Sequence, residues 1–120
     1  MATMNSVIEY VDRVKPNAYS EDEKYKWIAQ VEGLVSREVI GEEGTVLQLP
    51  EDADKPLQVG APYDGIYSLY VMAQIDFHNR EYNDYNNTAL MFGELLEKFK
   101  VWYIQNHAHG KAGNFRNVMG

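Results

Sequence analysis

Few residues of this chain have the types and the spacing that catalysis requires. His78 lies near Asp76 and Glu81 in the sequence, and a neighbouring carboxylate can orient a histidine as a general base. A histidine at the end of a helix explains the same pattern without any chemistry, and we favour that interpretation. None of the four serines stands in the G-x-S-x-G elbow of a hydrolase. We therefore expect no catalytic residue and no enzymatic activity.

Two motifs have donor atoms for a metal ion, and both are incomplete. His107 and His109 offer two imidazole nitrogens, whereas zinc sites use three or four protein ligands. The acidic run at residues 51–54 lacks the spacing, the glycine and the distal glutamate of a calcium loop. The chain has no cysteine, which excludes disulfides, thiolate nucleophiles and iron–sulfur sites. We expect neither a metal nor another cofactor.

Length, composition and charge limit the class of protein. A chain of 120 residues has the size of one domain, and a content of 45% hydrophobic residues excludes an intrinsically disordered protein. The net charge of −7 argues against direct wrapping of nucleic acid, because phosphate binding needs clustered lysine and arginine. No apolar run approaches about 18 residues, so we expect no membrane span and a cytoplasm-like compartment.

The spacing of apolar residues predicts two helices in the first part of the chain. The first covers residues 7–14, with Ser6 opening an S-x-x-E capping box. The second covers residues 20–40 and begins with the same box at Ser20. Gly41 follows as a natural C-cap, because glycine adopts the left-handed conformation that ends many helices.

Two further helices are predicted in the second half of the chain. Residues 64–77 are apolar on most sides, which is typical of a helix that is buried on most sides. Residues 80–106 carry an apolar seam whose members recur at alternating spacings of three and four. That seam comprises Tyr82, Tyr85, Ala89, Phe92, Leu96, Phe99 and Tyr103. We expect these two helices to pack as an antiparallel pair at the centre of the body.

Residues 41–62 connect the second and third helices without a helical period. A hairpin of residues 45–49 with 57–59 is one structure that their weak alternation permits. Most of the acids near this connection have no neighbouring base, so a solvated loop is the simpler interpretation. The alternative is an arm that contacts another subunit, because its scattered apolar residues would otherwise face water. The candidate contacts are Val46, Leu47, Leu49, Leu57 and Val59.

Residues 107–120 form a basic tail with no acid and no helical period. Lys111, Phe115 and Arg116 suit capture by an acidic partner, either the arm of an adjacent subunit or another protein. A flexible end without a role explains the same composition. The predicted fold is mainly α: one domain of residues 1–106 with a four-helix body and a long acidic loop or hairpin arm at 41–62, followed by a flexible tail.

Three sequence motifs together resemble a known family. They are KPNAYSEDEK at residues 15–24, APYDGIY at residues 61–67 and YNNTALMF at residues 85–92. With the helices around them, residues 6–40 and 61–107, they are similar to small head–tail connector (adaptor) proteins of tailed bacteriophages and of prophages of Gram-positive bacteria. The arm and the tail show no such similarity.

The resemblance implies a structural protein of virion assembly and DNA packaging, present in the bacterial cytoplasm first and in the phage neck afterwards. It implies a ring of about a dozen copies beneath the portal protein, with closed symmetry. It also implies a neck or tail-completion protein as the next partner, DNA as passing cargo in the channel, and no membrane. The alternative is a small helical protein-binding or regulatory module without catalytic activity. A small enzyme or metal protein is a third class, which we favour least.

Overall fold

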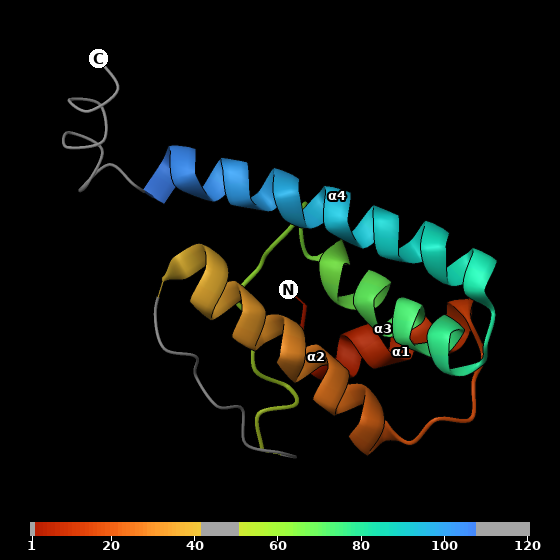
Figure 1. Cartoon of the computed structure of the whole chain (residues 1–120). Coiled ribbons are helices and arrows are strands. Elements are labelled where there is room, and N and C mark those ends of the chain that lie inside the picture. The colour runs from red at the N-terminus through yellow and green to blue at the C-terminus, as the bar shows by residue number, and fades with distance from the viewer. Residues whose placement is uncertain (1, 42–50, 108–120) are drawn as a thin grey trace.

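The computed structural model describes residues 2–41 and 51–107. Four helices form the body: α1 (Met4–Val14), α2 (Glu21–Val35), α3 (Gly65–His78) and α4 (Tyr82–His107), as Figure 1 shows. A π-helical segment, η1 (Ser36–Ile40), continues α2 directly. The described residues contain no strand. The prediction of a mainly α fold with a four-helix body is therefore confirmed.

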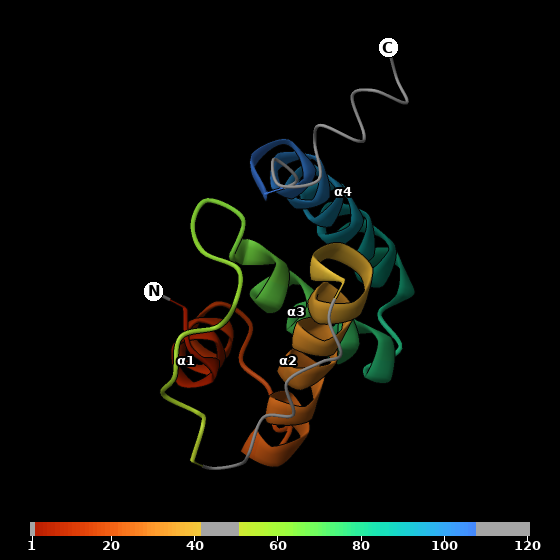
Figure 2. The ribbon, with the colours of Figure 1, turned by 90° about the vertical axis from the view of Figure 1, so that its left-hand side faces the viewer.

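Helix α3 is the central element of the body. It contacts α1, α2 and α4, whereas α4 contacts only α3 and η1 among the described helices. Figure 2 shows α3 between α4 on one side and the pair α1 and α2 on the other. Ile66, Tyr67, Val71 and Ile75 are fully buried on this helix. The expectation that the third helix is buried on most sides is confirmed.

Helices α3 and α4 run antiparallel, as the sequence predicts. Three ring contacts follow the pair in opposite chain order: Tyr63 with Phe99 at 5.7 Å, Tyr70 with Phe92 at 5.3 Å, and Phe77 with Tyr85 at 5.4 Å between centroids. Of the predicted seam, Leu96 and Phe99 are buried, while Tyr82 at its beginning is 54% exposed. The seam thus packs most deeply in the second half of α4.

Two helix starts differ from the prediction. Helix α1 begins at Met4 because the Thr3 side chain caps it, accepting a hydrogen bond from the Ser6 backbone N–H at 3.0 Å. The Ser6 hydroxyl in turn accepts from the Thr3 N–H at 2.8 Å, so Ser6 is the third residue of the helix and not its cap. Helix α4 begins at Tyr82 and not at residue 80, because Arg80 has a φ of 61°, outside the helical region.

The predicted boundaries of the second helix are borne out by its caps. The Ser20 side chain accepts a hydrogen bond from the Glu23 N–H at 3.2 Å, and three acids occupy the first turn of α2, where the helix dipole favours negative charge. Gly41 ends the helical run with a φ of 82°. No pattern in the sequence predicts the π-helical form of the last turn.

The second half of the predicted arm belongs to the core of its own chain. Leu57 and Val59 are 5% and 1% exposed. Backbone hydrogen bonds attach this segment to the N-terminus, from Asn5 N–H to the Ala53 carbonyl at 3.1 Å and from Leu57 N–H to the Ala2 carbonyl at 2.8 Å. The prediction that Leu57 and Val59 contact another subunit is therefore wrong. Neither residue lies in a strand, and the proposed partner strand at 45–49 is outside the described residues.

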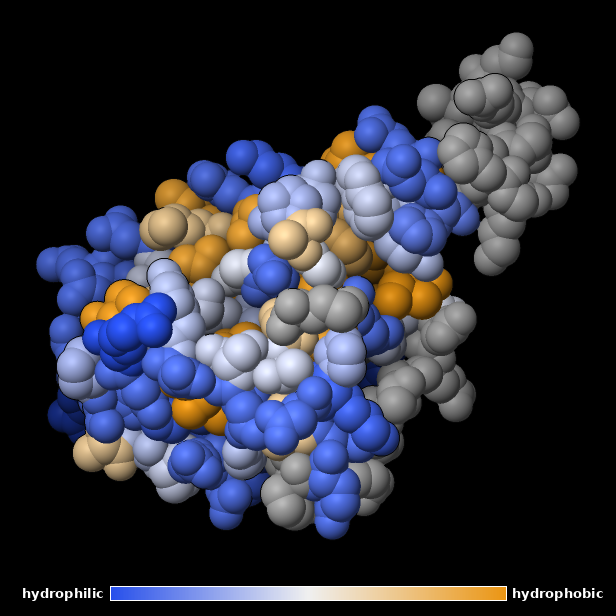
Figure 3. Space-filling model, turned by 180° about the vertical axis from the view of Figure 1, so that it is seen from behind, coloured by the Kyte–Doolittle hydropathy of each residue, from blue (hydrophilic) through white to orange (hydrophobic). Residues whose placement is uncertain are grey.

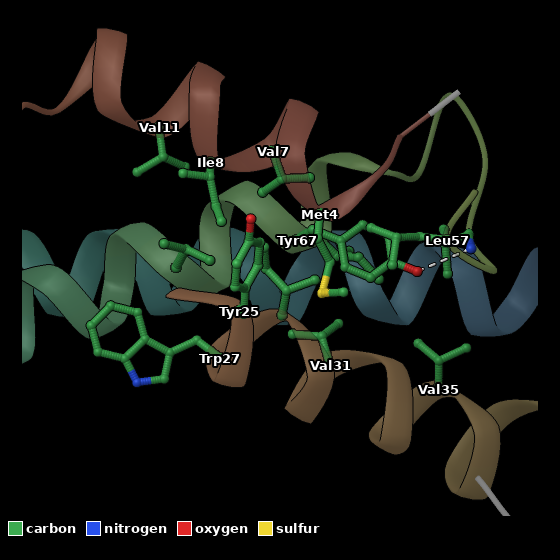
Figure 4. Close-up of a cluster of buried hydrophobic side chains, with 14 of the residues drawn as sticks. Met4, Val7, Ile8, Val11, Tyr25, Trp27, Val31, Val35, Leu57 and Tyr67 are labelled. Atoms are coloured by element: carbon green, nitrogen blue, oxygen red, sulfur yellow. Dashed lines mark hydrogen bonds between the residues drawn. The ribbon is translucent and has the colours of Figure 1, made fainter. Parts of the chain in front are cut away.

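A buried polar cluster holds this segment against α2 and α3. The Tyr67 hydroxyl donates a hydrogen bond to the Glu32 carboxylate and accepts one from the Val59 N–H at 3.0 Å. The second carboxylate oxygen of Glu32 accepts from the Gln58 N–H at 3.1 Å. Figure 4 shows Tyr67 among the apolar side chains of α1 and α2, with its hydroxyl directed to the loop. Burial, and next the charge of Glu32, raise the pKa of Tyr67 above its ordinary value.

Leu96 and Leu90 lie on opposite faces of α4, so replacing each by alanine should have very different effects on the free energy of unfolding. Leu96 is 8% exposed and Leu90 is 62% exposed. Leu96→Ala should lower the free energy of unfolding by roughly 2–5 kcal/mol, because it removes buried methyl groups and leaves a cavity. Leu90→Ala should change it by about 0.5 kcal/mol or less. Urea melts at low protein concentration measure both values, and equal losses would mean that α4 does not pack as described.

The raised pKa of Tyr67 predicts a loss of stability in alkaline solution. In the unfolded chain tyrosine ionises near pH 10, whereas folded Tyr67 keeps its proton to higher pH. The stabilisation is therefore complete below about pH 10 and is lost above it, by up to about 1.4 kcal/mol per pH unit. Tyr67→Phe should be less stable at pH 7, because Val59 and Glu32 lose a partner. Its free energy of unfolding, measured by urea melts, should decrease less steeply between pH 10 and 11 than that of wild type. Parallel pH profiles of the two proteins would contradict this account.

Candidate interaction surface

The histidines considered as chemical groups are packed on aromatic rings. His78 ends α3, and its ring stacks on Trp27 with 5.7 Å between centroids and an angle of 13°. His107 ends α4 and stacks on Tyr103 at 4.2 Å. The interpretation of His78 as a helix-end residue agrees with this placement. His109 lies outside the described residues.

One carboxylate cluster in the described residues has the geometry to hold a metal ion. Oxygen atoms of Asp76, Glu81 and Asp84 lie within 4.8 Å of one another. Asp76 is fully buried, and its oxygens already accept hydrogen bonds from the Lys15 ammonium at 2.6 Å and from the Thr88 hydroxyl at 3.0 Å. The hydrogen bond to Asp76 raises the pKa of Lys15. The lysine thus supplies the positive charge that this buried carboxylate requires, and the cluster joins the end of α1 to α3 and α4.

Most of the predicted contact residues cannot be compared with the structure. Leu57 and Val59 lie in the core, as described above. The remaining six lie outside the described residues; they are Val46, Leu47, Leu49, Lys111, Phe115 and Arg116. The two described candidates, Leu57 and Val59, therefore form no contact surface.

A different surface, the outer face of α4, carries large apolar side chains in contact with solvent. We define it by the residues that share the side of the helix turned away from α3. Its apolar members are Leu90, Val101 and Ile104, with Met91 and Trp102 along one edge; their exposed fractions lie between 39% and 62%. Trp102 also packs on Tyr63 at 5.6 Å and on Phe99 at 6.0 Å between ring centroids. In Figure 3 hydrophobic atoms alternate with hydrophilic ones along the upper edge of the molecule, which α4 forms. A group of exposed apolar residues often marks a site of interaction, whereas single exposed apolar residues are common and need no explanation.

Charged residues divide the outer face of α4 into two apolar parts. Glu94, Glu97 and Lys98 lie between Leu90 with Met91 at one end and Val101 with Trp102 at the other. A shallow groove runs along the C-terminal part; it is lined by Tyr63, Glu94, Glu97, Lys98, Val101, Trp102 and Gln105. The face offers apolar area for affinity and charges of both signs for orientation, but no nucleophile paired with a base.

The outer face could have been found in the sequence. Leu90, Val101 and Ile104 are spaced by 11 and 3 residues, so they share one side of a helix, and that side is opposite to the seam. A 26-residue helix with apolar residues on two opposite sides must either be buried on both or expose one. The regular spacing of the seam is the stronger of the two signals, and it hides the second stripe. Within residues 2–41 and 51–107 no helix is apolar over enough length to span a membrane.

The buried ion pair predicts a large effect of one lysine. Lys15→Ala would leave the buried Asp76 carboxylate without its cation, at a cost of about 2–4 kcal/mol in the free energy of unfolding. The cost should stay below that of a completely buried pair because the Lys15 side chain is 30% exposed. Lys26→Ala, a change of an exposed lysine on α2, is the matched control and should cost about 0.5 kcal/mol or less. Indistinguishable melts of the two variants would show that the pair does not stabilise the fold.

The outer face of α4 and the resemblance in the sequence are the two grounds on which a function can be argued. Comparisons with protein-family models, with curated proteins and with solved structures gave no match to this chain.

Proposed function

We propose that this chain is a structural assembly protein, a head–tail connector subunit of a tailed bacteriophage or prophage that forms a homo-oligomeric ring. The observation that carries the proposal is the exposed apolar face of α4, because a subunit of a permanent assembly has such a face to bury. The three motifs that resemble connector proteins add the specific class.

Residues of the three motifs make contacts that pack the helices together. In KPNAYSEDEK, Lys15 pairs with Asp76 and Lys24 with Asp12 at 2.7 Å. In APYDGIY, Tyr67 holds Glu32, and in YNNTALMF, Thr88 holds Asp76. The motifs thus describe how this body is built, and they support a shared fold with connector proteins. Assembly is supported separately, by the outer face of α4.

The proposed partners follow from the proposed class. The ring would contact the portal protein on one side and the next neck or tail-completion protein on the other, with DNA as passing cargo. A chain with a net charge of −7 suits the wall of such a channel, because like charges let DNA slide without adhering. The protein would be located in the host cytoplasm before assembly and in the virion neck afterwards.

A second candidate function is a small helical binding module without catalytic activity. The groove beside Trp102 favours it, because an exposed tryptophan flanked by charges is typical of a site that anchors a partner protein. The two functions differ in stoichiometry. A binding module takes one or two chains into its complex, whereas a connector takes a closed ring of identical chains.

Co-expression with the portal protein of the same genome tests the proposal. We expect native mass spectrometry and negative-stain images to show a ring of this chain attached to the portal. The double variant Leu90→Glu/Val101→Glu should reduce ring formation at least about 10-fold, because it places charges on the apolar face. Val14→Glu changes a 52% exposed valine on α1 and is the control that should still assemble.

Two results would contradict the proposed function. One is a complex with the portal that contains no ring of this chain, or no complex at all. The other is a genome in which no portal, capsid or tail gene lies near the gene for this chain. Equal assembly by the α4 double variant and by wild type would leave the class standing but remove α4 as the assembling face.

A further inference from the structure

The outer face of α4 has a pattern that reads the same from both ends. Two large apolar residues, Leu90 and Met91, lie about one and a half turns before the middle of this stretch, and Val101 and Trp102 lie at a similar distance after it. Between them Glu94 and its neighbour one turn later, Lys98, have opposite charges. Glu97 and Ile104 have no counterpart in this pattern, but the other six positions are symmetric in shape and antisymmetric in charge, so they are complementary to the same positions of a second copy.

We propose that a second copy of this chain covers this face, with the two α4 helices packed antiparallel about a twofold axis near residue 96. In this register Leu90 opposes Trp102 of the second copy, and Met91 opposes Val101. Glu94 opposes Lys98, and twofold symmetry repeats each of these contacts. The inference does not depend on the proposed function, because it concerns the isolated chain.

The charges select the antiparallel direction. In a parallel pair each residue opposes its own copy, so Glu94 would lie against Glu94 and Lys98 against Lys98, and both contacts would repel. The antiparallel pair converts the same four side chains into two attractive contacts. The apolar ends are matched as well, since Leu90 and Met91 of one copy meet Val101 and Trp102 of the other.

The position of α4 leaves room for a second copy. The helix has 26 residues against 14 in α3, and among the described helices only α3 and η1 contact it. Both contacts use the sides that face the body, so none of the described helices covers the outer side, which forms one edge of the molecule in Figure 1. Tyr63, in the segment before α3, reaches the edge of this side at Trp102. Asn87 and Gln105, both exposed, lie at the two ends of the stretch and on the same side.

Cross-linking through introduced cysteines tests the register directly, because the chain has no cysteine of its own. In the antiparallel dimer residue 87 of one copy lies beside residue 105 of the other. Two copies of residue 87 would lie about 27 Å apart along the helices, far beyond the roughly 7 Å between Cα atoms that a disulfide allows. Mild oxidation of an equimolar mixture of Asn87→Cys and Gln105→Cys should therefore give a disulfide-linked dimer. Each variant alone should remain uncrosslinked.

Exchange of the two charges is the second test. Native mass spectrometry measures the fraction of dimer for each variant and for wild type at the same protein concentration. Glu94→Lys and Lys98→Glu should each weaken the dimer about 10-fold, because every attractive contact becomes repulsive. An equimolar mixture of these two variants should regain the wild-type dimer as a heterodimer, since lysine then opposes glutamate at both contacts. Thermal melts of the single variants at low concentration control for folding. The mixing step separates pairing between chains from any effect within one helix.

Three results would overturn the inference. The first is a monomeric mass of the wild-type chain at every protein concentration, up to about 100-fold above the one used for the thermal melts. Cross-linking of Asn87→Cys alone would indicate a parallel pair, and failure of the mixed charge variants to regain the dimer would remove the Glu94–Lys98 contact. The isolated chain is used without a portal protein, so these outcomes are independent of the ring experiment.

Discussion

The contact between the Tyr67 hydroxyl and the Glu32 carboxylate determines how the rest of the body is arranged. It joins α2 to α3 in the interior, and each group has a further partner on the loop, Val59 for the hydroxyl and Gln58 for the carboxylate. A buried carboxylate with these donors satisfied is stable, whereas the loss of one donor leaves a desolvated charge. Gln58 and Val59 are therefore held against α2 and α3, and the hydrogen bond from Leu57 to Ala2 attaches the N-terminal residues before α1 to the same core.

The central position of α3 leaves α4 with one side in the core and one side in solvent. Aromatic pairs along α3 fix the inner side, from Tyr63 at one end to Phe77 at the other. The outer side retains apolar residues that the monomer does not bury. We propose that an antiparallel dimer covers this face in the isolated chain and that a ring covers part of it in an assembly. If both hold, the two modes compete by mass action, and ring formation depends on a partner that binds the ring form more tightly.

Signals that act within one or two turns of the chain were sufficient to predict most of the helices. The Ser20 cap, the glycine after η1 and the apolar content of α3 are local features, and the structure places each where the sequence does. The alternating seam also predicted that α4 packs antiparallel to α3. The start of α1 was predicted three residues late, because the sequence holds two possible caps. Ser6 begins an S-x-x-E capping box, but the structure uses Thr3 as the cap.

The sequence by itself determined the helical class, the order of the helices and the lack of any thiol chemistry, because composition and short-range spacing suffice for these properties. Only the tertiary structure decided which apolar residues are inside. Leu57 looks exposed in an acidic connection, yet its N–H bonds to Ala2 and its side chain is buried. Leu90 and Leu96 lie on opposite sides of one helix that is apolar on both, and the position of α3 decides that Leu96 is buried and Leu90 exposed. Burial depends on neighbours that are distant along the chain, such as Glu32 and Tyr67, and no local pattern specifies which distant segments meet.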